Sequence, residues 1–320
     1  MINVLVTGAS GFVGRRLCTQ LLKAGFGVKA VVRGSVPVEL SACEIIRAPS
    51  LTPETQWTAA LNNVDVVIHL AATVHLVGKK SAVSYEKYRD FNVGVTAQLA
   101  KSAALNQVKQ FIFLSSIKVN GERSILGQPF TEKTAETPEG SYAISKWEAE
   151  QALRKISAEE KLPVTILRPP LIYGPGVKAN FLTMMNWVER GIPLPFGAIK
   201  NKRSLLALDN LCDLLIVCLL NPRAENQTFV VCDAEPLSTT ELLSMLSRAL
   251  GVANRQLKIP PRLLTVVANV LGRGDMAGRL LDSLEVDMTH TCQTLSWVPP
   301  LKTCDALRLT AESFIRHKQH

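Results

Sequence analysis

VTGASGFVG, at residues 6–14, decides the fold of this 320-residue chain. The apolar run that leads into it predicts a buried strand, and the residues after Gly11 predict a helix. Gly8 permits a tight turn, Gly11 lets the backbone come close to a bound group, and Gly14 permits close contact between helix and strand. Since the start of a helix offers free N–H groups and a partial positive charge, this stretch predicts a cradle for a pyrophosphate.

Outward from this turn, short Val- and Ile-rich runs alternate with longer helical patterns over the first two thirds of the chain. This alternation is typical of parallel βαβ units, and continuous apolar runs indicate strands that are covered on both faces. We therefore predict an α/β fold, with a Rossmann-type doubly wound parallel sheet and a smaller mixed C-terminal lobe. The predicted strands are residues 2–7, 27–32, 43–46, 64–70, 110–114 and 164–167, and the predicted helices are residues 12–24, 92–107 and 142–158.

The character of the sequence changes after Arg168, where Pro- and Gly-rich loops mix with short helices. We predict a dinucleotide-binding domain at residues 1–168 and a substrate-binding lobe at residues 169–320, with room for the chain to return to the first domain. Two apolar stretches of the lobe, residues 211–220 and 263–271, are too short to cross a bilayer and predict buried helices.

The chain carries a net charge of +9, but its Lys and Arg residues are spread evenly over both halves. Without a basic stripe or tail, this charge does not indicate a nucleic-acid-binding protein. It suits a small anion such as NADP or a nucleoside diphosphate.

The cysteines, His69 and the first residues of the chain bear on the cellular compartment and on metal binding. The seven cysteines include no CxxC pair, which indicates reduced thiols rather than disulfides. His69 lies within an apolar run, so we expect a packed histidine and no metal ligand. The first residues lack the basic flank and long apolar stretch of a secretory signal. Together these features predict a cytoplasmic protein with no bound metal and no membrane span.

Tyr142 and Lys146 are four residues apart in a predicted helix, so their side chains share one face. An ammonium held beside a phenol favours the phenolate and brings its pKa of about 10 closer to neutrality. We therefore expect Lys146 to tune Tyr142 for proton exchange. Upstream, the predicted strand 110–114 ends in Ser115 and Ser116, at the carboxyl edge where such sheets bind ligands.

The end of the second predicted strand carries Val32 and Arg33, where an enzyme that prefers NAD places an acidic residue for the adenosine ribose. An acid would repel a 2′-phosphate, whereas a guanidinium grips it. We therefore predict NADP, with NAD as the alternative. Arg15 and Arg16 are candidates to reinforce Arg33, and the competing interpretation of Arg33 is a solvated surface arginine.

The chain resembles the extended branch of the short-chain dehydrogenase/reductase superfamily, which includes the NAD-dependent epimerase/dehydratase family. The resemblance rests on the GxxGxxG spacing, on DVVIHLAA at residues 65–72, on NVGVT at residues 92–96, and on the Tyr-x-x-x-Lys pattern at residues 142–146.

The resemblance implies specific site residues. Alignment through Gly121 makes Ser116 the catalytic serine, with Ser115 as the near alternative, and Lys146 also holds the nicotinamide ribose. The catalytic set is then Ser116, Tyr142 and Lys146. The implied cofactor contacts are Gly8, Ser10, Gly11, Phe12, Val13, Gly14, Arg33, Leu70, Ala71, Ala72, Asn92, Ser115, Tyr142, Lys146 and Pro169.

RPPLIYGPG, at residues 168–176, is similar to the passage that follows the sixth strand in nucleotide-sugar enzymes of this branch, and LSWVPP at residues 295–300 is similar to their C-terminal part. The similarity implies a UDP-sugar substrate and a homodimer. The substrate contacts implied in this way, to diphosphate, uracil or sugar, are Lys118, Asn120, Asn180, Phe196, Arg203 and Arg279.

Three functions follow from this resemblance. The first is a 4-ketoreductase for a UDP-linked 2-acetamido-2,6-dideoxyhexosulose in surface polysaccharide (O-antigen) synthesis, because an NADP site suits an enzyme that exchanges its cofactor. The second is a UDP-hexose 4-epimerase acting on UDP-glucose or UDP-N-acetylglucosamine. The third, from another class, is a catalytically silent NADP sensor or scaffold. Dehydration is disfavoured because Ile117 and Lys118 stand where dehydratases of the family carry an acidic pair.

Overall fold

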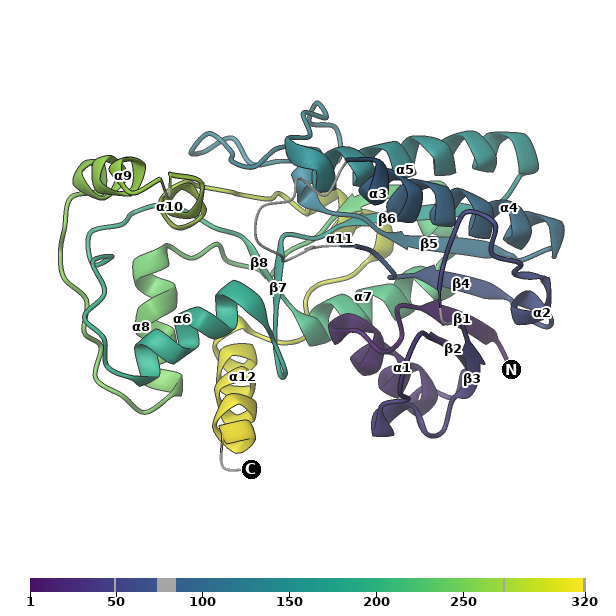
Figure 1. Ribbon diagram of the computed structural model, residues 1–320, viewed down its shortest axis with the longest axis horizontal. Coiled ribbons are helices and arrows are strands. Elements are labelled where there is room, and N and C mark those ends of the chain that lie inside the picture. Colours follow the sequence, from purple (N-terminus) through teal and green to yellow (C-terminus); the bar gives the residue numbers. More distant parts are fainter. Residues whose placement is uncertain (49, 74–84, 273, 319–320) are drawn as a thin grey trace.

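The protein is built around a parallel sheet of seven strands in the order β3-β2-β1-β4-β5-β6-β9, with helices on both faces (Figure 1). The computed structural model describes residues 1–48, 50–73, 85–272 and 274–318. The predicted fold class is confirmed, since the strand order reverses between β1 and β4 as in a doubly wound sheet. The strands are β1 (Asn3–Thr7), β2 (Gly27–Val32), β3 (Glu44–Arg47), β4 (Val66–His69), β5 (Gln110–Leu114), β6 (Val164–Arg168) and β9 (Thr228–Val230).

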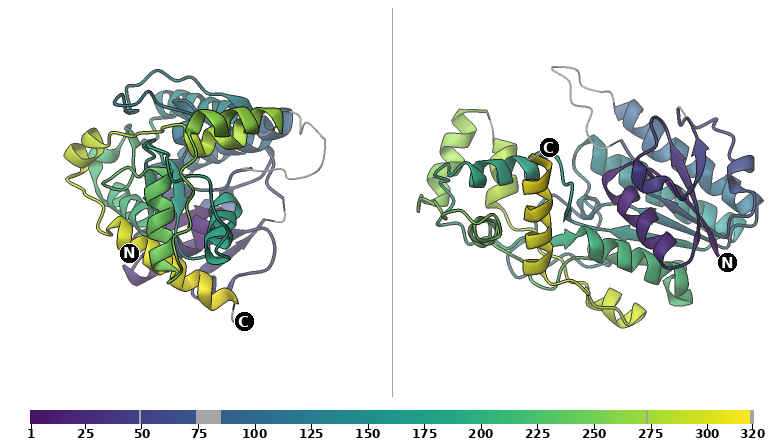
Figure 2. Two further views of the ribbon diagram at one scale, coloured as in Figure 1. Left: turned by 90° about the vertical axis from the view of Figure 1, so that its left-hand side faces the viewer. Right: turned by 90° about the horizontal axis from the view of Figure 1, so that it is seen from below.

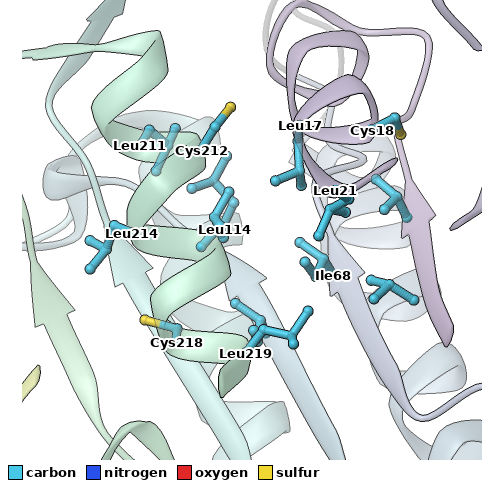
Figure 3. Close-up of a cluster of buried hydrophobic side chains, with 14 of the residues drawn as sticks. Leu17, Cys18, Leu21, Ile68, Leu114, Leu211, Cys212, Leu214, Cys218 and Leu219 are labelled. Atoms are coloured by element: carbon cyan, nitrogen blue, oxygen red, sulfur yellow. The ribbon is translucent and has the colours of Figure 1, made fainter. Parts of the chain in front are cut away.

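Two hydrophobic layers hold the helices to the sheet. Helices α1 (Phe12–Lys23) and α7 (Leu208–Leu220) cover one face, and α4 (Thr96–Leu105) and α5 (Gly140–Glu160) cover the other. Figure 3 shows the first layer, where leucines of α1 and α7 meet the side chains of β4 and β5. Because successive side chains of a strand alternate between faces, β4 contributes to both layers, which explains its unbroken apolar run.

The predicted strands are all present, with ends that differ by one or two residues. The predicted helices 12–24 and 142–158 correspond to α1 and α5. The predicted helix 92–107 is divided, because Asp90–Val95 forms a π-helical turn before α4. Such turns carry one residue more than an α turn and often lie at functional sites.

A second body lies beside the carboxyl edge of the sheet (Figure 2). Its core is shared by α6 (Ala179–Glu189), α8 (Thr239–Ala249) and α12 (Thr303–Lys318), next to a small parallel pair of strands, β7 (Leu171–Tyr173) and β8 (Leu205–Ala207). The chain does not stay in this body, since α7 packs on α1 and β9 pairs with β6. The other helices are α2 (Thr58–Leu61), α3 (Tyr85–Arg89), α9 (Pro261–Val270), α10 (Gly274–Leu281) and α11 (Thr289–Leu295).

The two apolar stretches of the lobe differ in burial. Residues 211–220 lie in α7 and are largely buried, as predicted. The prediction of a buried helix at residues 263–271 is wrong: α9 forms there, but none of its residues is buried. Hydrophobicity along a helix predicts an apolar face, whereas burial needs a second element to cover that face. Among the described residues, no helix is long and apolar enough to cross a membrane.

Candidate active site

The turn between β1 and α1 has the shape of a phosphate cradle. Gly8 has a φ of +69°, and the Gly11 amide donates a 2.9 Å hydrogen bond to the Gly8 carbonyl. A Cβ atom at Gly14 would lie 2.2 Å from the Gly8 carbonyl oxygen, and one at Gly8 would lie 2.8 Å from the Ala71 amide nitrogen. No described side chain caps the start of α1, so its N–H groups remain available. These residues therefore fit a dinucleotide pyrophosphate.

The other predicted cofactor contacts lie around this turn. Ser10 and Gly11 are exposed at its tip, while Phe12 and Val13 pack partly against the core. Leu70, Ala71 and Ala72 follow β4 at the same edge of the sheet, and the Pro169 carbonyl accepts a 2.9 Å hydrogen bond from Ile117.

His69 is a buried polar link between the sheet and the helix layer. Burial, aided by the charge of Lys146, lowers its pKa to about 3, so the ring is neutral at physiological pH. Its two nitrogens lie 2.6 Å from Thr7 Oγ1 and 2.9 Å from Thr96 Oγ1. Because Thr96 already donates its proton to the Asn92 carbonyl, Nε2 donates to Thr96 and Nδ1 accepts from Thr7. This confirms a packed histidine.

Asn92, in the π-helical turn, ties the segment after β4 to the helix that carries the candidate tyrosine. Its Oδ1 accepts a 2.8 Å hydrogen bond from the Thr73 amide, and its Nδ2 donates to Ser145 Oγ at 2.9 Å. Ser145 in turn donates to the Tyr142 carbonyl. With its side chain fully used by protein partners, Asn92 is placed to position the site.

Ser116, rather than Ser115, contacts the phenol of Tyr142. A hydrogen bond from the Ser116 hydroxyl lowers the pKa of Tyr142, but burial outweighs it and raises that pKa to about 12. Ser115 points elsewhere and donates a 2.5 Å hydrogen bond to Glu150. The two serines diverge because adjacent residues of an extended chain face opposite sides.

Lys146 is buried in the same region, and its contacts with described residues run to β5. Its Nζ donates a 2.8 Å hydrogen bond to the Leu114 carbonyl and lies 4.4 Å from the centre of the Phe113 ring. Burial lowers the pKa of Lys146 to about 7, while the nearby Glu150 opposes this shift. Burial is thus the main cause of the pKa shift of both Tyr142 and Lys146. The tuning of Tyr142 by Lys146 stays a prediction.

A buried ion cluster behind the serines was not foreseen from the sequence. Arg168, which is fully buried, donates to Glu150 through Nε at 3.0 Å and Nη2 at 2.5 Å, and its Nη2 also pairs with Glu136. Glu150 lies four residues after Lys146, on the same side of α5, and this spacing was the one available signal. The cluster joins β6, α5 and the loop after β5.

The adenosine end of the site is basic. Arg33, just beyond β2, is exposed and stacks over the Phe91 ring, 5.8 Å from its centre. Arg47, at the end of the neighbouring β3, donates a 3.4 Å hydrogen bond to the Gly34 carbonyl. Arg15 is 3.5 Å from Glu39, and Arg16 is paired with Asp209, so neither is a free cation. Arg33 and Arg47 are the guanidinium groups available to a 2′-phosphate.

Three of the predicted substrate contacts form a charged group on the lobe side. Arg203 donates to the Asp282 carbonyl at 2.8 Å, and the charge of the exposed Arg279 helps to lower its pKa, although burial is the larger cause. Lys118 pairs with Glu122 at 2.6 Å, and the charge of Glu122 also reaches Arg203. The structure thus brings Lys118, Arg203 and Arg279 into one neighbourhood.

The other three predicted substrate contacts differ in their surroundings. Asn180 is exposed at the start of α6, and Phe196 packs partly into the core of the lobe. Asn120 is buried: its Oδ1 accepts from Arg168 and its Nδ2 donates to the Thr134 carbonyl. Its side chain is committed to the ion cluster, so the prediction that it contacts the substrate directly is corrected to a supporting role.

Comparison with known proteins identifies relatives along the whole chain. A protein from Vibrio cholerae named UDP-glucose 4-epimerase is 40% identical over 316 residues, which are 98% of this chain and 96% of that protein. An Escherichia coli O157:H7 protein named N-acetyl-α-D-glucosaminyl-diphospho-ditrans,octacis-undecaprenol 4-epimerase is 28% identical over 272 residues, 84% of this chain and 77% of that protein.

A solved structure shares the fold, and a family model identifies the family. The crystal structure of a UDP-glucose 4-epimerase from Thermotoga maritima, solved with UDP-glucose, matches with a TM-score of 0.79 and 22% identity, and the match covers 100% of both chains. The model of the NAD dependent epimerase/dehydratase family matches residues 4–232. The predicted resemblance is confirmed, and the chain belongs to the NAD dependent epimerase/dehydratase family.

Proposed function

We propose that this protein is a UDP-sugar 4-epimerase that works with a bound nicotinamide dinucleotide. The observation that carries the proposal is the 40% identity to the Vibrio cholerae UDP-glucose 4-epimerase over nearly both full lengths. The positions of Ser116, Tyr142 and Lys146 around one edge of the sheet support an active enzyme rather than a silent sensor or scaffold. The findings thus favour our second sequence-based hypothesis over the first.

The glycine turn at Gly8, Gly11 and Gly14 would hold a nicotinamide dinucleotide, which would supply the hydride chemistry of the proposed reaction. Tyr142 Oη exchanges the proton of the C4 hydroxyl, and Ser116 Oγ holds the reacting oxygen close to that phenol. Since its pKa is about 12, the phenol is protonated at neutral pH and must lose that proton before it can take one from the sugar, so a positive charge close by is needed to favour the phenolate. Arg203 and Arg279 would hold the diphosphate while the sugar turns and presents the other face of C4.

The test is to incubate purified protein with UDP-glucose and with UDP-N-acetylglucosamine, and to follow the C4 configuration by NMR. An epimerase interconverts the gluco and galacto forms without net change in nicotinamide absorbance. Conversion of neither sugar, by protein that binds the dinucleotide, would count against the proposal. We expect the reaction to take place in the cytoplasm and to serve surface-polysaccharide synthesis.

A second candidate, the UDP-4-keto-hexosamine reductase, is favoured by Arg33 and Arg47. These guanidinium groups suit the 2′-phosphate of NADP, and NADP suits an enzyme that releases its cofactor in every turnover. Stoichiometric oxidation of NADPH by a UDP-4-ketosugar, with no epimerisation of UDP-hexoses, would replace the first proposal by this one.

We also propose a homodimer through α4 and α5 for either enzyme. The mass of the protein in solution, measured by light scattering, tests this proposal.

Replacing Arg33 by Ser is expected to weaken NADP binding by about tenfold to a hundredfold and to leave NAD binding nearly unchanged. The reason is the loss of a charge-assisted hydrogen bond to the 2′-phosphate, worth about 1.5–3 kcal/mol. Titrations of both dinucleotides by calorimetry measure the ratio. Arg316→Ser, which removes a charge at the end of α12, is the matched control. Equal weakening of NAD and NADP would contradict the assignment.

A further inference from the structure

Helix α9 presents a complete apolar stripe to solvent. Its outward residues follow the spacing i, i+3, i+4, i+7 and i+8, which places them on one face of the helix. Leu263 is 53% exposed, Val266 58%, Val267 48%, Val270 82% and Leu271 65%. A stripe of this kind normally packs against a protein core, and here none of the described residues buries it.

Two basic residues lie at the start of α9, and the sequence around it is poor in acidic residues. Lys258 and Arg262 are exposed on and just before α9. No Asp or Glu occurs from position 242 to position 274, and the next acidic residue is Asp275, in α10. Leu257, which precedes Lys258 in the chain, is 52% exposed. An apolar stripe beside cations is the pattern of helices that lie in the interface of an anionic membrane.

The position of α9 leaves the stripe accessible. It lies at the end of the molecule opposite β1, β2 and β3, and it packs against α10 (Figure 1). It takes no part in the glycine turn or in the site around Tyr142. The exposed Arg279 lies in the last turn of α10, so the same outer region adjoins the diphosphate contact proposed above.

We propose that α9 is a membrane-docking helix, which lies flat on the surface of a bilayer that contains anionic phospholipid. The apolar stripe enters the boundary between headgroups and acyl chains, while Lys258 and Arg262 meet the lipid phosphates. Charge favours this partner over a second copy of the chain, since two such helices would bring their cations together. The inference goes beyond the proposed 4-epimerase activity and does not depend on it.

The test is sedimentation of the whole protein with sucrose-loaded vesicles of phosphatidylcholine, with and without about 30% phosphatidylglycerol. We expect binding to the anionic vesicles that falls as salt is raised, and little binding to phosphatidylcholine alone. Leu263→Ser with Val270→Ser is expected to weaken partition about tenfold or more, because the buried hydrocarbon is removed. Lys258→Ser with Arg262→Ser is expected to reduce binding to anionic vesicles only.

The matched control is Val298→Ser with Leu220→Ser, which removes two side chains that are 70% and 57% exposed, one after α11 and one at the end of α7. It should leave vesicle binding unchanged. Thermal unfolding and dinucleotide binding verify that each variant is folded. Equal binding by the α9 variant and the native protein would overturn the proposal. So would a native dimer, measured by light scattering without lipid, that the α9 variant alone converts to a monomer.

Discussion

Replacing Tyr142 by Phe is expected to lower kcat by about two to four orders of magnitude, because the phenol is the group that exchanges the proton of the sugar hydroxyl. Dinucleotide binding and the free energy of unfolding should change little, since only one oxygen is removed. The measurement is steady-state turnover of the UDP-sugar that the protein accepts, together with a dinucleotide titration of the same preparation.

Tyr85→Phe is the control for Tyr142→Phe. It also removes a phenol oxygen, but that oxygen donates its hydrogen bond to Glu148. Its kcat should stay within about threefold of the native value, as is usual when a group outside the chemistry is changed. If both variants kept native turnover, Tyr142 would not carry the proton and the proposed chemistry would fail.

The largest expected loss of stability follows the change of Arg168 to Met. The side chains of Arg168 and Glu150 are both fully buried, so the change takes away the buried cation and leaves the Glu150 carboxylate paired with the half-exposed Arg154. Breaking a buried pair in this way costs about 3–5 kcal/mol. Urea unfolding followed by circular dichroism measures the loss.

A matched variant separates burial from charge in this prediction. Arg154 pairs with the same Glu150 at 3.4 Å, but its side chain is 45% exposed, so Arg154→Met is expected to cost at most about 1 kcal/mol. If Arg168→Met does not fold, combining it with Glu150→Gln should restore folding, because the buried negative charge is then absent. Equal losses for the two single variants would show that burial does not govern the pair.

The fold was predictable because its signals are local. The glycine turn, the apolar runs of the strands and the periodicity of the helices each involve neighbouring residues, and the sheet followed from their order along the chain. Which face of a helix another element covers was not predictable in this way. Whether α9 is covered depends on segments distant in the sequence, so its hydrophobicity alone led to the wrong expectation of burial.

The candidate site was predictable in its residue types but not in its contacts. Sequence spacing placed Tyr142 and Lys146 on one face of α5, but it could not show that Lys146 would bond the Leu114 carbonyl. The choice between Ser115 and Ser116 needed the direction of each side chain at the end of β5. From the sequence, Arg168 was recognised only as the first residue of the RPPLIYGPG motif. The one sign of its partner Glu150 was the four-residue helical spacing from Lys146.

The edge strand β9 has a consequence for how the protein can be dissected. β6 hydrogen-bonds on one side to β5 and on the other to β9, which the chain supplies only at residues 228–230. A fragment that stops at residue 168 would leave the backbone groups of β6 unpaired along one side. Bare strand edges recruit other chains, so such a fragment should self-associate into insoluble material. A fragment that reaches past β9 keeps this edge capped.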